Sequence, residues 1–274
     1  MGRIACAAAL CLILTPIGVG CRNDSYNART APETAVPAVA SPAIITPTPV
    51  FQLRSVHYRT DITMRSTLAD GTKTGYGARM EGDMVAPNSY SVHAEFFSLT
   101  DPSDNDVASV IVVDDAAWKR VETVTWVQTD TRDPIIEAFE DIASLRVLHA
   151  SPRDIIRPAV GLDAKRETLG GVKALRFDIT PTEEELRHEP PPPEIVQGLL
   201  GGGQLVGDDA LTMTWWVTPN YQQLLKVRIR ARFEPERVGD LFPQDVPEGT
   251  IVDYSVTATF THHDDPSIKI EPPV

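Results

Sequence analysis

The chain has 274 residues, 42% of them hydrophobic, and a formal net charge of −13 at pH 7. Residues 1–50 carry three arginines against one aspartate and one glutamate, so residues 51–274 hold a net charge of −14. This excess of carboxylates argues against binding of nucleic acid, because such binding depends on neutralising phosphates. It also argues against the domain lying flat on an anionic membrane.

The first 20 residues have the layout of a secretory signal peptide. Arg3 supplies a positive charge, residues 4–17 form an apolar run, and small residues lead into Cys21. The apolar run is too short to span a bilayer. Cys21 resembles the lipobox cysteine of bacterial lipoproteins, which is acylated and becomes the mature N-terminus. The alternative is an ordinary cleaved signal peptide with an incidental cysteine.

The three cysteines support lipidation. Cys6 and Cys11 lie in the segment that would be removed, which leaves Cys21 without a disulfide partner. A lone cysteine in an exported chain needs an explanation, and acylation, for example with palmitate, provides one. We therefore predict an extracytoplasmic protein anchored to a cell membrane through lipidated Cys21.

Residues 21–50 are predicted to be a disordered tether. Prolines at positions 32, 37, 42, 47 and 49 alternate with Ala, Thr, Ser and Val, and aromatic residues are almost absent. Such a stretch buries too little apolar surface to offset its chain entropy, and its prolines favour extended conformations. A proline-rich docking motif is the alternative, but no PxxP with flanking specificity residues occurs. Residues 51–274 then form a single domain.

Apolar and polar side chains alternate with a period of two in four segments of this domain: residues 55–65, 89–96, 224–233 and 253–260. This alternation predicts strands with one buried and one solvated face, as is typical of antiparallel sheets. Four dipeptides mark turns: Asp70–Gly71, Asp114–Asp115, Gly170–Gly171 and Pro219–Asn220.

Two helical segments interrupt the strands. Asp133–Pro134 is a start signal, with Asp as the N-cap and Pro at the first helical position, and apolar residues recur at helical spacing over 133–147. A weaker segment, Glu194–Leu200, lies between Pro190–Pro193 and Gly201–Gly203. This second segment is either a movable lid or a surface loop that packs a few aliphatic side chains.

The order of these features resembles the LolA/LolB-like superfamily, particularly lipoproteins of the LppX/LprA/LprF/LprG type. The resemblance rests on the layout and on three segments: Ser109–Trp126 with its hairpin and Trp, Ala210–Pro219 with its aromatic-Val-x-Pro turn, and Phe260–Pro272 with its Ile-x-x-Pro ending. It implies a mainly β fold, a curved antiparallel half-barrel sheet whose concave face is covered by helices around an apolar cavity. Members of the superfamily carry acyl chains.

If the cavity exists, its lining comes from the inward-facing side chains of the alternating strands and of the first helix. Aromatic and Met side chains suit acyl chains because they are large, apolar and adaptable in shape. A face of this kind is also compatible with an ordinary packed core. The predicted lining residues are Tyr58, Ile62, Met64, Met80, Tyr90, Val92, Phe96, Phe139, Trp215, Val227, Ile229, Tyr254, Val256 and Phe260. The pattern does not decide which of the neighbouring Trp215 and Trp216 points inward.

Other polar groups predict no catalytic or metal site. His262–Asp265 contains metal-capable side chains, but neighbours on a strand point to opposite faces and no further His or Cys cluster completes a ligand set. No nucleophile elbow, zincin, Walker or dinucleotide-binding motif occurs. We expect neither an enzyme nor a cofactor. The basic stripe Lys226, Arg228, Arg230 and Arg232 is expected on the outer face, opposite carboxylates such as Asp253. The alternative is that it contacts anionic headgroups or glycans.

The sequence thus predicts a monomeric, membrane-anchored lipoprotein that binds or carries a lipid or other amphiphile in an apolar cavity. Its partners would be the membrane, reached through Cys21, and a lipid or acylated ligand. A protein-interaction or envelope-sensing module with a packed core is one alternative. A surface protein that captures solutes without a preference for lipids is another.

Overall fold

The computed structural model describes residues 54–86, 89–101, 103–122, 125–136, 139, 164–180, 204–207, 210–220, 223–234 and 248–273. Cys21, the predicted tether and Glu194–Leu200 lie outside these residues. The described part is dominated by strands: β1 (Ser55–Thr67), β2 (Lys73–Val85), β3 (Ser89–Ser98), β4 (Asn105–Val113), β5 (Ala116–Val121), β6 (Val127–Thr129), β7 (Lys165–Leu169), β8 (Val172–Ile179), β9 (Gln204–Leu205), β10 (Leu211–Val217), β11 (Leu224–Glu234) and β12 (Ile251–Thr261).

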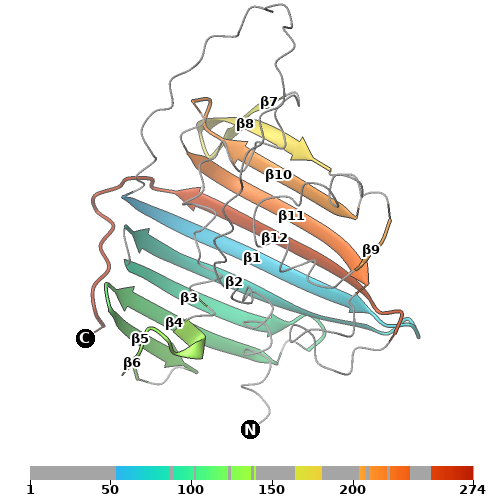
Figure 1. The fold of residues 1–274 in the computed structure, drawn as a ribbon, viewed down its shortest axis with the longest axis horizontal. Helices are drawn as coiled ribbons and strands as arrows, with labels where there is room; N and C mark the ends of the chain where they lie inside the picture. The colour runs from blue at the N-terminus through green and yellow to red at the C-terminus, as the bar shows by residue number, and fades with distance from the viewer. Residues whose placement is uncertain are drawn as a thin grey trace, which may run out of the picture.

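All twelve strands belong to one antiparallel sheet (Figure 1). Its order is β6-β5-β4-β3-β2-β1-β12-β11-β10-β8-β7, and β9 pairs with β11 beyond the end of β10. The first and last strands, β1 and β12, are therefore neighbours in the middle of the sheet. Among the described strands, β6 and β7 form the two edges and do not pair with each other. The predicted mainly β, antiparallel architecture is confirmed. The described sheet is open, because its two edge strands do not pair.

The four segments with alternating side chains are strands, as predicted: they correspond to β1, β3, β11 and β12. The four predicted turns join consecutive strands. In the first of them, Asp70 accepts a hydrogen bond from the Thr72 amide at 2.8 Å, and Gly71 has a φ of +83° that glycine adopts without strain. Gly170 and Gly171 also have positive φ values between β7 and β8.

The sheet has two chemically different faces. The inner face carries Val56, Tyr58 and Ile62 of β1 and the residues in register with them, and these side chains form one large apolar cluster. The outer face carries mostly charged and hydroxyl side chains. Because successive residues on a strand point to opposite faces, the period of two in the sequence becomes a separation between an apolar and a polar side.

Gly82 of β2 permits a close approach between neighbouring strands. A Cβ at this position would lie 1.9 Å from the Ser91 carbonyl oxygen and 2.9 Å from the Tyr58 hydroxyl. Since glycine has no Cβ, the Tyr58 hydroxyl passes over β2 and donates a hydrogen bond to the Ser91 carbonyl of β3 at 3.1 Å. This bond ties three adjacent strands together on the inner face.

The first predicted helix begins where the sequence indicates, with helical residues at 134–136 and 139. Ile136 and Phe139 are both buried in the apolar cluster of the inner face. Both contact β3. The Phe139 and Phe96 ring centroids are 6.2 Å apart, and the Tyr90 hydroxyl donates a hydrogen bond to the Ile136 carbonyl oxygen. The other residues of the predicted helix lie outside the described ranges. The coverage of a concave face by helices therefore stays a prediction. Within the described ranges, no helix is long and apolar enough to cross a membrane.

Candidate functional site

All fourteen predicted lining residues lie in the apolar cluster of the inner face. Twelve of them are buried, whereas Met64 and Val256 are partly exposed. That they line a ligand cavity stays a prediction. They come from β1 (Tyr58, Ile62, Met64), β2 (Met80), β3 (Tyr90, Val92, Phe96), the helix start (Phe139), β10 (Trp215), β11 (Val227, Ile229) and β12 (Tyr254, Val256, Phe260).

The inner face also contains buried residues that the sequence pattern did not single out. Val110 and Val112 come from β4, Phe177 and Ile179 from β8, and Met213 from β10. The segment that becomes β4 is almost continuously apolar, so its alternation is hidden. In β8 the same signal was present, because Leu175, Phe177 and Ile179 alternate with Arg176 and Asp178.

Burial of the inner face is uneven. On the two central strands, Met64 of β1 and both Val256 and Ala258 of β12 are partly exposed apolar residues. In the row of Ala258, Met80 of β2 and Val227 of β11 are buried, whereas Tyr76, the β2 partner of Met64, is 37% exposed. The two central strands therefore present a patch of partly accessible apolar surface on the inner face. We call Met64, Val256 and Ala258 the central patch.

Trp215 lies two strands away from Ala258 of the central patch. Its register partner on β11 is Val227, and Val227 in turn pairs with Ala258 of β12, so the three residues form one row across the sheet. Trp215 therefore points to the inner face, which settles the choice that the sequence left open. The indole is 1% exposed. Among the described residues, its Nε1–H is the one buried side-chain polar group without a hydrogen-bond partner.

The two buried tyrosines of the central strands, Tyr58 and Tyr254, add no charge to the inner face. Burial raises the pKa of the Tyr58 hydroxyl, with further contributions from Tyr90 and Asp83, and burial alone raises the pKa of Tyr254. Both hydroxyls are therefore neutral at physiological pH. The Tyr90 hydroxyl lies 3.5 Å from the Ile136 carbonyl oxygen of the helix start, to which it donates.

One ion pair fixes the helix start at the margin of the inner face. Lys119 of β5 pairs in register with Val110, and its Nζ lies 2.5 Å from Asp133 Oδ2. Asp133 also accepts hydrogen bonds from the Ile135 amide and the Thr129 hydroxyl, both at 3.0 Å. Burial alone would raise the pKa of Asp133, but the hydrogen bonds from Lys119, Ile135 and Thr129 lower it. The N-cap was predicted from the sequence, and its partner Lys119 was not.

The outer face has its own small cluster around Trp216. This indole is 5% exposed and packs with Ala174 and Leu225. Its Nε1–H donates to Glu167 at 2.7 Å. The two neighbouring tryptophans therefore lie on opposite faces, and only the outer one has a partner for its N–H.

The basic stripe lies on the outer face, as expected, but its partners are mostly not carboxylates. Arg232 faces Asp253 at 3.9 Å. Lys226 and Arg228 instead lie over the Trp216 ring, at 5.2 Å and 5.8 Å from its centroid. Such cation–π contacts stabilise an aromatic ring on a face that is otherwise mostly polar.

The segment His262–Asp265 follows β12 and forms hydrogen bonds with the beginning of β1. His263 Nε2 lies 2.9 Å from the Leu224 carbonyl oxygen, while the His262 ring stands 6.0 Å from that of His57. Asp264 accepts a hydrogen bond from the Arg54 amide at 2.7 Å. Burial lowers the pKa of His263 despite the opposing effects of Leu224 and Asp264. Among the residues that the structure describes, no group of three His, Cys, Asp or Glu side chains is placed to hold a metal ion.

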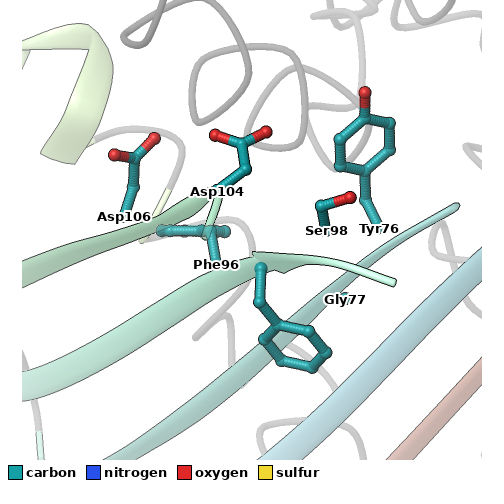
Figure 2. A pocket seen from close by; sticks show the side chains of 7 residues that line it. Tyr76, Gly77, Phe96, Ser98, Asp104 and Asp106 are labelled. Atoms are coloured by element: carbon teal, nitrogen blue, oxygen red, sulfur yellow. The ribbon is translucent and has the colours of Figure 1, made fainter. Parts of the chain in front are cut away.

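A separate small pocket lies where β2, β3 and β4 meet the loop around Asp104 (Figure 2). It encloses about 20 Å³, room for roughly one water molecule. A more open depression of about 460 Å³ adjoins it, and its lining includes the ion pair between Arg79 and Glu95 at 3.4 Å. The lining also includes Val107, Phe97 and the predicted lining residue Phe96, so this depression combines apolar and charged side chains.

No family model matches the chain, and no curated protein matches it in sequence. Its structural neighbours include a DUF1329 family protein from Desulfovibrio piger, with 10% identity, coverage of 80% of this chain and 89% of that chain, and a TM-score of 0.25. A putative outer membrane lipoprotein-sorting protein domain from Vibrio parahaemolyticus has 11% identity, 78% and 87% coverage and a TM-score of 0.25. A LolA superfamily protein from Nitrosomonas europaea has 10% identity, 80% and 87% coverage and a TM-score of 0.19. The superfamily that the sequence resembles is thus among the neighbours, but matches at these TM-scores carry no argument about function.

Proposed function

We propose that the protein is a membrane-anchored extracytoplasmic lipoprotein that binds the acyl chain of a lipid or other amphiphile on the inner face of its sheet, without catalysis. The observation that carries this proposal is the central patch. Met64, Val256 and Ala258 keep accessible apolar surface on the two central strands of the inner face. An acyl chain laid over these residues would remove both its own apolar surface and theirs from water.

The hydrophobic effect makes such a complex favourable. Each CH₂ group that leaves water contributes about 0.8 kcal/mol, so an acyl chain gains affinity in proportion to its buried length. The buried tyrosines near the patch are neutral, and the only described ion pair of this face, Lys119 with Asp133, lies at its margin. The anchor at Cys21, predicted from the sequence, would hold the domain beside a membrane that supplies such chains.

The direct test uses the full chain with Cys21→Ser, which cannot be acylated at that position. The protein is purified without detergent, extracted with organic solvent, and analysed by mass spectrometry. Stoichiometric acyl species support the proposal and identify the class of cargo. A protein without bound lipid that also fails to take up a fluorescent fatty acid would contradict it and favour an interaction module with a packed core.

A matched pair of substitutions tests the location. Ala258→Trp places a large side chain on the central patch, where partial exposure gives it room, and should abolish lipid uptake while the protein remains folded. Thr257→Trp adds the same side chain on the outer face of the same strand and should leave uptake unchanged. Ala94→Trp is a poor choice for this purpose, because Ala94 is 0% exposed and the insertion would overpack the core. Equal uptake by both β12 variants would place any lipid elsewhere.

A further inference from the structure

The basic stripe has no part in the proposed function, because it lies on the opposite face of the sheet from the central patch. Residues 51–274 hold a net charge of −14, yet the outer faces of β11, β12 and β1 hold six Lys or Arg side chains against three carboxylates. Exposed charges are screened beyond about 8 Å at physiological ionic strength, so a ligand at this surface meets the local cations rather than the net charge. The cations are Lys226, Arg228, Arg230, Arg232, Arg59 and Arg65, and the carboxylates are Glu234, Asp253 and Asp61.

Three of the four cations of the basic stripe have no acidic partner. Lys226, Arg228 and Arg230 form no ion pair with any carboxylate in the described part of the chain. By contrast, Arg79 and Arg176 on the same face each pair with two carboxylates. Neighbouring like charges repel each other, so an anion bound along the stripe would supply the neutralising charge that the protein does not.

Hydroxyl side chains border these cations. Arg230 has Thr212 and Ser255 as its register neighbours, and Arg228 has Thr257 on the side of β12. Adjacent strands are about 4.8 Å apart, so one anion can accept hydrogen bonds from a guanidinium of β11 and from a hydroxyl of β12. The guanidinium fork matches carboxylate and phosphate alike, but the oxygen atoms of a phosphate are arranged tetrahedrally and can reach donors on two strands. The set of donors therefore favours phosphate.

The basic stripe is long and narrow. From Lys226 to Arg232 it extends about 20 Å along β11. Carboxylates lie two strands, or about 10 Å, to either side, with Asp178 on β8 and Asp61 on β1. A broad anionic surface such as a bilayer would meet these carboxylates, whereas a single extended chain along β11 would not. Trp216, the aromatic ring beside the stripe, is 5% exposed and offers no accessible face for stacking a base.

We propose that an extended polymer that carries phosphate groups but no bases binds along the basic stripe on the outer face. Arg228 and Arg230 are the principal donors, and the hydroxyls of β10 and β12 complete the contacts. This site is independent of lipid binding on the inner face, so either can exist without the other.

The experiment measures the fluorescence anisotropy of end-labelled inorganic polyphosphate titrated with the full chain carrying Cys21→Ser. Binding is expected, and it should weaken as salt is added, because salt screens exposed charges. Arg230→Gln should lower the affinity about tenfold, the effect of losing one charge-assisted contact. Since the Arg230 side chain is exposed and forms no described ion pair, this variant keeps its core. Arg79→Gln is the matched control, because it removes the same charge from the same face at a cation that already has acidic partners, and it should bind like the wild type.

Two further probes define the class of ligand. Polyglutamate of matched charge should bind more weakly than polyphosphate, and vesicles that contain anionic phospholipid should not displace the labelled chain. No binding of polyphosphate at low ionic strength, or equal affinities of Arg230→Gln and the wild type, would overturn the site. Equal binding of polyglutamate would overturn the preference for phosphate, and displacement by the vesicles would make the stripe a membrane contact instead of a polymer site.

Discussion

The contact between Asp133 and Lys119 fixes the helix start against the inner face, and removing it should have a measurable cost. Asp133→Ala deletes an N-cap, which costs about 1 kcal/mol. It also removes the acceptor for Thr129 and for Lys119, whose side chain is only 26% exposed, and the loss of such hydrogen bonds adds roughly 1–2 kcal/mol. We therefore expect the free energy of unfolding to fall by about 2–3 kcal/mol.

Urea denaturation followed by tryptophan fluorescence measures this change. Asp133→Asn is the control, because asparagine still caps a helix but carries no charge, and it should lose only about 1 kcal/mol. Lys119→Met should also destabilise the protein, since it leaves the Asp133 carboxylate without its cation. An Asp133→Ala variant within about 0.5 kcal/mol of the wild type, or one no worse than Asp133→Asn, would refute this account of the helix start.

Acidification should reproduce part of the effect. The pKa of Asp133 is lowered in the folded protein, so its contribution to stability is complete above the unfolded value of about 3.9 and is lost as the pH falls through the lower folded value. The difference in unfolding free energy between the wild type and Asp133→Asn should therefore shrink at low pH. A difference that is independent of pH would show that the carboxylate charge plays no part.

Two further predictions concern the backbone and the histidine at the end of β12. Gly82→Ala should destabilise the protein by roughly 1–3 kcal/mol, because its Cβ would meet the Ser91 carbonyl oxygen at 1.9 Å; an unchanged melting temperature would contradict this. The pKa of His263 is lowered in the fold, chiefly by burial, so the unfolded chain binds more protons below its value of about 6.5, and stability should fall as the pH decreases through that range. His263→Gln should flatten this dependence, and an equally steep fall in both proteins would exclude His263 as its source.

Much of the sheet could be predicted from the sequence because β1, β3, β11 and β12 have one buried and one solvated face. The burial boundary then appears directly as alternation along the chain. The segments that became β4 and β5 lack this signal, since β4 is nearly all apolar and β5 brings a lysine to the inner face. Whether that lysine is tolerated depends on Asp133, which belongs to another element and is brought near only by the fold.

The orientation of the two tryptophans illustrates a different limit. The register changes between Trp216 and Val217, where one residue of β11 has no partner. Such an irregularity shifts the side of the sheet to which residues point by one position. Counting outward from the Pro219–Asn220 turn therefore gives the wrong face for Val227, the β11 partner of Trp215, because Leu224 and Val227 both lie in the inner-face cluster although they are three residues apart. The central patch was likewise invisible in the sequence, because Val256 and the buried Tyr254 belong to the same alternating pattern.

The adjacency of β1 and β12 also determines when the proposed binding surface can form. Tyr58 pairs with Phe260 and Met64 with Tyr254, so the middle of the sheet joins the two ends of the folded chain. Contacts between residues so distant in sequence make folding slow, and this pairing cannot form before the last strand has been made. Met64 lies on β1, and Val256 and Ala258 lie on β12. The proposed binding surface is consequently completed last, and a chain that ends before β12 lacks Val256 and Ala258, two of its three residues.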